Sequence, residues 1–298
     1  MSTNASFTPP SGARTYRLCT PRGEFAAVDS PVADGTEPRG TVLMLPGFTG
    51  SKEDFTLLHG PLAARGYRTV AVDGRGQYES PGPEHDEAPY AQEELARDVL
   101  AQVTALAVPV HLLGHSLGGQ IARAAALLDP APFLSLTLVS SGPARISDSQ
   151  RQRVRLLRDA LDTLTMEEVW KVMRAMGPPE EAEGAARGPA DQERLRDRWL
   201  GTTPAQLRVT GRQLCEEPDR IPELAALPLP FHVLSGESDD TWPVPLLDDM
   251  ARRLSAHRTV VAGAEHSPNT DRPLPTARAL ADFWDTVPGE RPDDFPGI

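Results

Sequence analysis

Short apolar segments bounded by turn residues recur along the chain, and they alternate with longer segments whose apolar residues repeat at helical spacing. The short segments are rich in Val and Leu with few polar interruptions, as is typical of strands covered on both faces. Their alternation with helices predicts an α/β fold with a mostly parallel central sheet and helices on both faces. The predicted strands are 41–46, 68–73, 109–114, 134–140, 230–236 and 258–263, and the predicted helices are 54–65, 90–105, 117–129, 244–255 and 274–286.

One long stretch departs from this alternation. Between residues 146 and 224 the sequence is charged, poor in strand-like segments and helical in its apolar spacing. We therefore predict a core formed by 1–145 and 225–298, with 146–224 as a helical insertion; a plain surface linker is the alternative. Within the insertion, segment 177–190 is rich in Gly, Pro, Ala and Glu, a composition that favours a mobile loop between helices.

Length and cysteine content narrow the class of protein. A chain of 298 residues is long enough for a large core with one inserted subdomain. The two cysteines, Cys19 and Cys215, have no paired spacing, which argues against a disulfide framework and against thiolate zinc sites. The polar, proline-punctuated start lacks the apolar region of a signal peptide, and no segment approaches the length of a membrane span. We therefore expect a soluble, cytoplasmic protein without a membrane partner.

The charge balance bears on partners. The net charge is −12, and only two of the thirty basic residues are lysines, so the sequence contains no basic stripe. Such a chain would repel a phosphate backbone, and we do not expect nucleic acid to be a partner. The sequence does not indicate an oligomeric state.

The strongest chemical signal is the segment LLGHSLGGQIARAAALL. In it, Gly114, Ser116 and Gly118 form a Gly-x-Ser-x-Gly pattern between a predicted strand and an alanine-rich helix. This is the position of a nucleophile elbow, a sharp turn that exposes a reactive serine. Small residues are needed on either side of the serine because side chains there would collide with adjoining backbone. A serine that caps the helix is the alternative, but the position between strand and helix favours Ser116 as a nucleophile.

Serine is a poor nucleophile at neutral pH, so the site requires a base within reach and an acid that fixes the tautomer of the base. In enzymes with a nucleophile elbow, the chain order is serine, then aspartate or glutamate, then histidine. Only His257 and His266 follow the predicted strand 230–236. His257 lies at the start of its strand, on the wrong edge of a parallel sheet, whereas His266 follows the carboxyl end of the same strand. We predict His266 as the general base, with a solvated loop histidine as the alternative, and His115 as a packing residue.

The acid must come from the loop GESDDTWP, which offers Glu237, Asp239 and Asp240. Adjacent side chains in a turning loop point in different directions, so at most one of the two aspartates faces His266. The other then faces solvent or caps the next helix. The residues themselves leave this choice open.

Several of these segments resemble the α/β-hydrolase family. The family commonly has a glycine, an aspartate three residues later and a proline further on, and Gly236, Asp239 and Pro243 match that pattern. Its terminal signature, a glycine shortly before a histidine that small residues follow, is similar to segment 263–267. The resemblance covers most of both predicted core segments. It implies an α/β-hydrolase fold with a helical cap insertion, and Asp239 as the acid that orients His266.

The resemblance also implies two backbone N–H donors for the oxyanion of a tetrahedral intermediate. One is the N–H of Leu117, directly after the nucleophile, and the other is the N–H of Phe48 in the loop PGFTGSKEDF. Pro46 stands in this loop where the family often has histidine, and taken alone Pro-Gly is an ordinary turn dipeptide. Asp73 and Arg75 lie in a segment similar to the Asp-x-Arg-Gly loop of the family, and we interpret them as structural.

These features predict a serine hydrolase that cleaves a small to medium carboxylic ester through an acyl-enzyme. Ser116 attacks, His266 takes and returns the proton, and Asp239 holds the imidazole. The expected partner is a small-molecule substrate, with no metal and no organic cofactor. The resemblance leaves lactonase, thioesterase, peptidase, C–C hydrolase and cofactor-free haloperoxidase chemistry open. A non-catalytic ligand-binding protein that keeps the fold is the alternative from another class.

We expect the substrate to be selected by a pocket between the core and the insertion. Four large apolar residues of the insertion, Trp170, Met173, Met176 and Trp199, are candidates for its lining. A second apolar core inside the insertion is an equal alternative for them.

Overall fold

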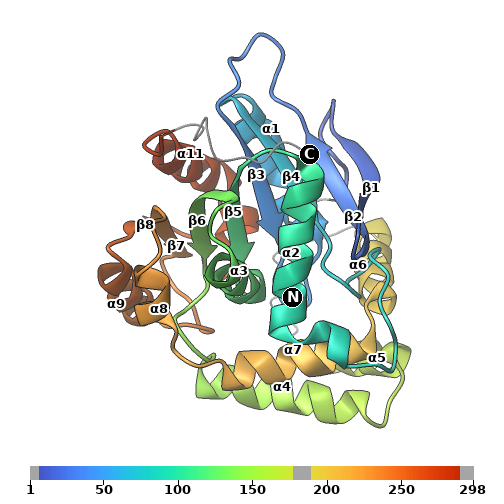
Figure 1. The fold of residues 1–298 in the computed structure, drawn as a ribbon. Helices are drawn as coiled ribbons and strands as arrows, with labels where there is room; N and C mark the ends of the chain where they lie inside the picture. The colour runs from blue at the N-terminus through green and yellow to red at the C-terminus, as the bar shows by residue number, and fades with distance from the viewer. Residues whose placement is uncertain (1–6, 177–188, 289–298) are drawn as a thin grey trace.

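The computed structural model describes residues 7–176 and 189–288. Within these residues the chain forms a central eight-stranded sheet with the strand order β1-β2-β4-β3-β5-β6-β7-β8 (Figure 1). The pairs β1–β2 and β2–β4 are antiparallel, and the other neighbours are parallel. The strands are β1 (Arg14–Thr20), β2 (Gly23–Ser30), β3 (Gly40–Leu45), β4 (Tyr67–Val72), β5 (Val110–His115), β6 (Phe133–Val139), β7 (Phe231–Gly236) and β8 (His257–Val261).

The predicted α/β fold with a mostly parallel sheet is confirmed, and each of the six predicted strands overlaps one of the strands β3 to β8. The sequence pattern did not predict β1 and β2. β1 lies at the edge of the sheet, and because most of its side chains are exposed or half-buried, its sequence RTYRLCT contains no apolar run. β2 begins and ends with polar residues, which shortens its apolar segment.

Apolar side chains alternate between the two faces of the sheet, as the two-residue period of a strand requires. On β3, Leu43 and Leu45 pack in a cluster with residues of α2, α3 and α9, whereas Val42 and Met44 pack with residues of α1 and α11. The sheet is therefore covered on both faces (Figure 1). The helices of the core are η1 (Lys52–Phe55), α1 (Thr56–Ala63), η2 (Ala88–Tyr90), α2 (Gln92–Leu106), α3 (Leu117–Leu128), α9 (Val244–Leu254), α10 (Pro268–Asp271) and α11 (Pro273–Trp284).

Helices follow one another between β6 and β7, over the segment in which the sequence predicts an insertion. Four of them, α4 to α7, lie together at one end of the sheet (Figure 1), and we refer to these four as the inserted helices. The predicted loop 177–190 lies outside the described residues apart from its last two positions, which begin α6. No described helix is both long enough and apolar enough to cross a membrane. The helices between β6 and β7 are α4 (Asp148–Leu161), α5 (Met166–Met176), α6 (Pro189–Gly201), α7 (Pro204–Glu216) and α8 (Ile221–Ala225).

Candidate active site

Ser116 occupies the turn between β5 and α3. Its backbone has φ 53° and ψ −117°, a left-handed conformation that an L-residue rarely adopts. The N–H of Ser116 donates to the carbonyl oxygen of Val139 on the neighbouring strand β6, at 2.9 Å. Because surrounding structure must hold a strained residue of this kind, the turn indicates a functional position.

The glycines around Ser116 allow this turn by close backbone contact. A Cβ atom at Gly118 would lie 2.3 Å from the carbonyl oxygen of Leu45, at the end of β3. A Cβ atom at Gly114 would lie 2.3 Å from the carbonyl oxygen of Gly118 itself. Both distances are far below contact, so the pattern of small residues seen in the sequence is a steric requirement of this elbow.

Ser116, His266 and Asp239 form one hydrogen-bonded chain. His266 Nε2 lies 3.1 Å from Ser116 Oγ, and His266 Nδ1 lies 3.0 Å from each carboxylate oxygen of Asp239. A carboxylate only accepts hydrogen bonds, so Nδ1 of a neutral His266 carries the proton and Nε2 accepts from the serine hydroxyl. The side chain of Asp239 is fully buried, whereas that of His266 is 27% exposed. The arrangement can activate a serine that a small molecule reaches from solvent.

The loop after β7 holds Asp239 in this orientation. Asp239 Oδ1 accepts hydrogen bonds from the backbone N–H groups of Thr241, at 2.8 Å, and Trp242, at 3.1 Å. The indole of Trp242 is buried and stacks against the His266 ring, with the ring centroids 6.2 Å apart. Contacts from the same short loop therefore hold both the Asp239 carboxylate and the His266 ring.

The two other carboxylates of this loop face elsewhere. Glu237 Oε2 accepts from the N–H of Gly263, at 3.0 Å. Asp240 accepts from the side-chain amide of Gln150 on α4 and lies 3.7 Å from the guanidinium of Arg153. Of the two expectations for the second aspartate, the one that places it in solvent is confirmed, because the Asp240 side chain is 64% exposed. It does not cap α9, which begins after Pro243 without a side-chain cap, and it also contacts an inserted helix.

His115 supports the base without replacing it. Its Nε2 donates to the backbone carbonyl of His266, at 2.9 Å. Burial lowers the pKa of His115 to about 4, and the neighbouring His266 adds to this effect, so its ring is neutral at neutral pH. The ring packs within the elbow, as the sequence analysis expected, and it also ties β5 to the loop that carries the base. His257 lies at the opposite end of β8, where its ring stacks on Phe283.

The loop between β3 and η1 approaches the nucleophile closely. A Cβ atom at Gly47 would lie 3.4 Å from the Cβ of Ser116, and Phe48 follows in the turn closed by Gly50 N–H and Gly47 O. The side chain of Gln77 donates to Gly47 O at 2.9 Å, and it thereby supports the loop in which Pro46 replaces the usual histidine. The sequence has no local signal for Gln77, because the contact spans thirty residues.

The second predicted donor lies at the start of α3. Leu117 is the first residue of this helix, where a backbone N–H has no intrahelical acceptor and the helix dipole favours negative charge. Phe48 lies on the loop between β3 and η1, and Leu117 directly follows Ser116 at the start of α3.

A cavity of about 350 Å³ opens above Ser116 and His266. Its walls come from the loop after β3, from α4 and α7, and from the loops after β7 and β8. Apolar lining is provided by Phe48, Ile146, Val154 and Leu214, and charged lining by Asp54, Arg153, Asp240, Glu265 and Asp271. A cavity of this size suits a small ligand.

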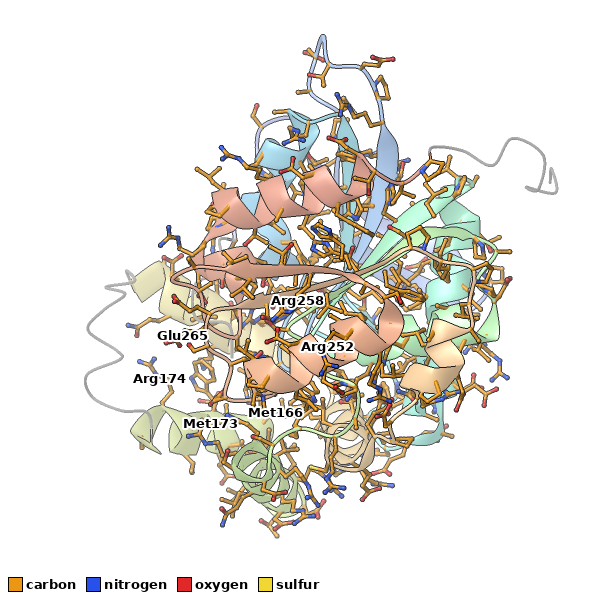
Figure 2. The ribbon with its side chains drawn as sticks, turned by 90° about the vertical axis from the view of Figure 1, so that its left-hand side faces the viewer. Met166, Met173, Arg174, Arg252, Arg258 and Glu265 are labelled. Atoms are coloured by element: carbon orange, nitrogen blue, oxygen red, sulfur yellow. The ribbon has the colours of Figure 1, made fainter. Side chains whose placement is uncertain are left out.

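Three of the apolar residues singled out in the insertion, Trp170, Met173 and Trp199, are not among the described residues that line this cavity. Trp199 packs in a separate cluster with Leu161, Val169 and Leu207, and Trp170 and Met173 pack against the same cluster. Figure 2 shows Met173 in the lower part of the molecule and Glu265, which lines the cavity, above it. The side chain of Met176 lies outside the described residues. Trp170, Met173 and Trp199 therefore form part of a second apolar core, the alternative that the sequence left open for them.

Comparison with known proteins extends the resemblance seen in the sequence. The chain matches the model of the alpha/beta hydrolase family over residues 42–279. The pimeloyl-(acyl-carrier protein) methyl ester esterase of Aeromonas hydrophila is 31% identical over 246 residues, which are 75% of this chain and 92% of that protein. The protein of the same name from Edwardsiella ictaluri is 29% identical over 260 residues, 78% of this chain and 94% of that protein. A shorter match, to a protein of Variovorax paradoxus named as a carbamate hydrolase, is 40% identical over 101 residues and spans 37% of that protein.

Solved structures share the fold. An esterase from Thermogutta terrifontis superposes with a TM-score of 0.73 at 22% identity, covering 92% of this chain and 99% of that chain. The enol-lactonase of Burkholderia xenovorans superposes with a TM-score of 0.73 at 19% identity, covering 91% of this chain and all of that chain, 100%. Identities this low establish the fold alone. The fold, together with the family match over residues 42–279, identifies this chain as a member of the alpha/beta hydrolase family.

Proposed function

We propose that this chain hydrolyses carboxylic esters of small molecules through an acyl-enzyme formed on Ser116. The single observation that carries the proposal is the hydrogen-bonded chain from Ser116 Oγ through His266 to the buried Asp239, with Ser116 and His266 lining a cavity. Relatives that are named as methyl ester esterases support the same reaction class.

In the first half of the reaction, Ser116 Oγ attacks the ester carbonyl carbon while its proton moves to His266 Nε2. The resulting imidazolium is stabilised by the buried carboxylate of Asp239, which contacts Nδ1. The carbonyl oxygen becomes an oxyanion, and the N–H groups of Phe48 and Leu117 are its proposed donors. Collapse of this intermediate breaks the ester C–O bond, and His266 returns the proton to the departing alcohol.

In the second half, a water molecule enters the position that the alcohol has left. His266 Nε2 takes a proton from this water, and the hydroxyl attacks the acyl carbon through the same oxyanion position. The bond between the acyl carbon and Ser116 Oγ then breaks, His266 returns its proton to Ser116 Oγ, and the free carboxylic acid is released. These steps use only side chains, backbone N–H groups and water.

The cavity and the relatives indicate which substrates to test first. A volume of about 350 Å³ accommodates a short to medium acyl chain. The relatives of Aeromonas and Edwardsiella are named for a methyl ester, so methyl esters of medium-chain acids are a natural starting panel. We propose the cytoplasm as the location, which agrees with the free thiols of Cys19 and Cys215.

A fluorophosphonate probe tests the proposal directly. The native chain is expected to be labelled at Ser116 and to cleave p-nitrophenyl esters, and Ser116→Ala is expected to lose both properties. Ser235→Ala is the matched control, because Ser235 is buried on β7 and does not line the cavity. Absence of labelling in well-folded native protein would contradict the proposal and favour a ligand-binding role. Thioester and lactone substrates in the same assay decide between ester hydrolysis and thioesterase or lactonase activity.

A further inference from the structure

A buried ion pair joins the loop after β3 to an inserted helix. Arg198 of α6 donates from Nη1 to Asp54 Oδ1 at 2.8 Å, and both side chains are only 1% exposed. Asp54 belongs to η1, directly after the turn that carries Phe48. Nearby, Lys52 pairs with the carboxylates of Asp73, Glu53 and Glu79, so its charge is directed to a different group of acids.

The carboxylate of Asp54 lies directly against the backbone of this turn. Asp54 Oδ2 accepts from the N–H of Ser51 at 3.3 Å, and a Cβ atom at Gly50 would lie 2.3 Å from the same oxygen. The guanidinium of Arg198 also reaches the hydroxyl of Ser51, at 3.5 Å. Direct contacts therefore connect Arg198, through the Asp54 carboxylate, to the backbone at Gly50 and Ser51, the second and third residues after Phe48.

Asp54 also contacts the segment that carries the base. Its backbone carbonyl accepts from the side-chain amide of Asn269 at 2.8 Å, and Asn269 lies on α10, three residues after His266. The residue next to Arg198 on α6, Trp199, belongs to the apolar cluster against which the Phe48 side chain packs. Helix α6 thus contacts η1 through the charge of Arg198, and through Trp199 it belongs to the apolar cluster on which Phe48 packs.

We infer that Asp54 and Arg198 are a positioning pair that keeps the N–H of Phe48 directed at the oxyanion. Burying two charges is costly, and apolar residues of similar volume often give equal or greater stability, so stability alone does not account for such a pair. A charged hydrogen bond has a defined direction, which an apolar contact lacks, and it fixes the turn in one arrangement. This inference rests on the proposed function and extends it, because it makes the inserted helices part of the catalytic geometry as well as of the substrate pocket.

The inference is tested by separating kcat from KM. In Arg198→Met the turn loses its charged partner, so kcat for a good p-nitrophenyl ester is expected to fall about 10²-fold to 10³-fold, the loss typical of one oxyanion donor. KM is expected to change less than about threefold, because ground-state contacts with the substrate are retained. Arg198→Lys keeps the charge but loses the planar guanidinium, and it is expected to recover about tenfold of the lost kcat. Asp54→Asn should resemble Arg198→Met.

A second measurement reports on the oxyanion position itself. A trifluoromethyl ketone adds to the serine and places an oxyanion between the two N–H donors, whereas a carboxylic acid product does not. The affinity of Arg198→Met for the ketone is expected to fall by the same factor as its kcat. Its affinity for the acid should stay within about threefold of the native value.

Arg123→Met is the matched control, because Arg123 of α3 is equally buried, and its guanidinium contacts Glu217 at 3.0 Å and the carbonyl oxygen of Gly142 at 2.7 Å, away from the loop after β3. Its kcat is expected to stay within about threefold of the native value. An equal loss of kcat in Arg123→Met, or a rise in KM at unchanged kcat in Arg198→Met, would overturn the inference. If Arg198→Met does not fold by circular dichroism, the same comparison is decided with Arg198→Lys and Asp54→Asn. If the native protein is labelled by the probe but Arg198→Met keeps full activity, the inference fails while the proposed function stands. If the native protein is not labelled, the proposed function itself fails.

Discussion

Asp239 and Asp240 are adjacent in sequence, yet their carboxylates contact different parts of the molecule. Asp239 is fully buried and binds His266 Nδ1 with both oxygens at 3.0 Å. Asp240 is largely exposed and contacts Gln150 and Arg153 of the inserted helix α4. The backbone turns directly after Asp239, and the hydrogen bond from the N–H of Thr241 to Asp239 Oδ1 closes this turn. One carboxylate thus contacts the His266 imidazole, and the next joins the core to an inserted helix.

This difference predicts different effects of the same substitution. Asp239→Asn should lower kcat about 10⁴-fold, because an amide keeps the volume but lets the imidazole take the wrong tautomer, as in the serine proteases. Asp240→Asn should change kcat by less than about threefold and lower the free energy of unfolding by about 0.2 to 1 kcal/mol, the usual range for an exposed pair. The measurements are kcat on one ester and urea unfolding of both variants. A large loss of kcat in Asp240→Asn, with near-native kcat in Asp239→Asn, would show that Asp240 and not Asp239 is the acid.

Because the backbone of Ser116 is strained, we expect glycine at this position to give a more stable protein than alanine does. Glycine adopts φ 53° without steric cost, whereas alanine does not. The free energy of unfolding, measured with urea, should therefore be about 1 kcal/mol higher for Ser116→Gly than for Ser116→Ala. The control is Ser135 on the extended strand β6, where glycine should be the less stable of the two substitutions. Equal stability of the two Ser116 variants would mean that the turn is not strained.

The lining of the cavity predicts where acyl-chain selectivity resides. Val154 of α4 lines the cavity, so Val154→Ala should raise kcat/KM for an octanoyl ester relative to an acetyl ester by about tenfold or more, the scale of one or two methylene groups. Trp170→Ala should leave this ratio unchanged, because Trp170 packs in the separate cluster of the inserted helices. A p-nitrophenyl ester series of increasing acyl length measures both variants. A changed ratio in Trp170→Ala, with an unchanged ratio in Val154→Ala, would indicate that Trp170 contacts the substrate.

Buried histidines predict loss of stability in mild acid. Burial lowers the pKa of His59 to about 4, and its Nδ1 lies 2.6 Å from Thr69 Oγ1. The unfolded chain has the ordinary pKa of about 6.5, so it binds more protons between these values, and the free energy of unfolding falls as the pH decreases from about 6.5 to about 4. His59→Gln should remove about 3 kcal/mol of this acid-induced loss. Urea unfolding at several pH values measures it, with the exposed His85→Gln as a control that should keep the native slope.

The sequence predicted the parallel part of the fold because buried strands leave a local signal. Each of β3 to β8 is an apolar segment bounded by turn residues, and its position could be read within a few residues. The carboxyl ends of such strands meet at one edge, which is why the order of Ser116, Asp239 and His266 along the chain led to residues that the structure brings together. The choice between Asp239 and Asp240 needed the resemblance, because side-chain direction in a turn has no signature in the residues themselves.

Contacts between distant segments had no such signal. Asp54 and Arg198 are 144 residues apart, and Gln77 reaches Gly47 across thirty residues, so no local period or spacing indicates either contact. The two tryptophans of the insertion, Trp170 and Trp199, show helical spacing, which is equally compatible with a core and with a pocket wall. Which of these they form depends on the packing of α5 and α6 against α7, a property of the tertiary structure.

The position of β8 has a consequence for how this protein loses activity on heating. β8 is the last strand of the sheet, it pairs with β7 alone, and it carries the loop of His266. Ser116, in contrast, follows β5 in the middle of the sheet. An edge strand opens in local unfolding events that require less free energy than unfolding of the whole chain. Heat inactivation is therefore expected to begin with reversible detachment of the base from an intact nucleophile, so that esterase activity declines at temperatures where the circular dichroism of the sheet is still native.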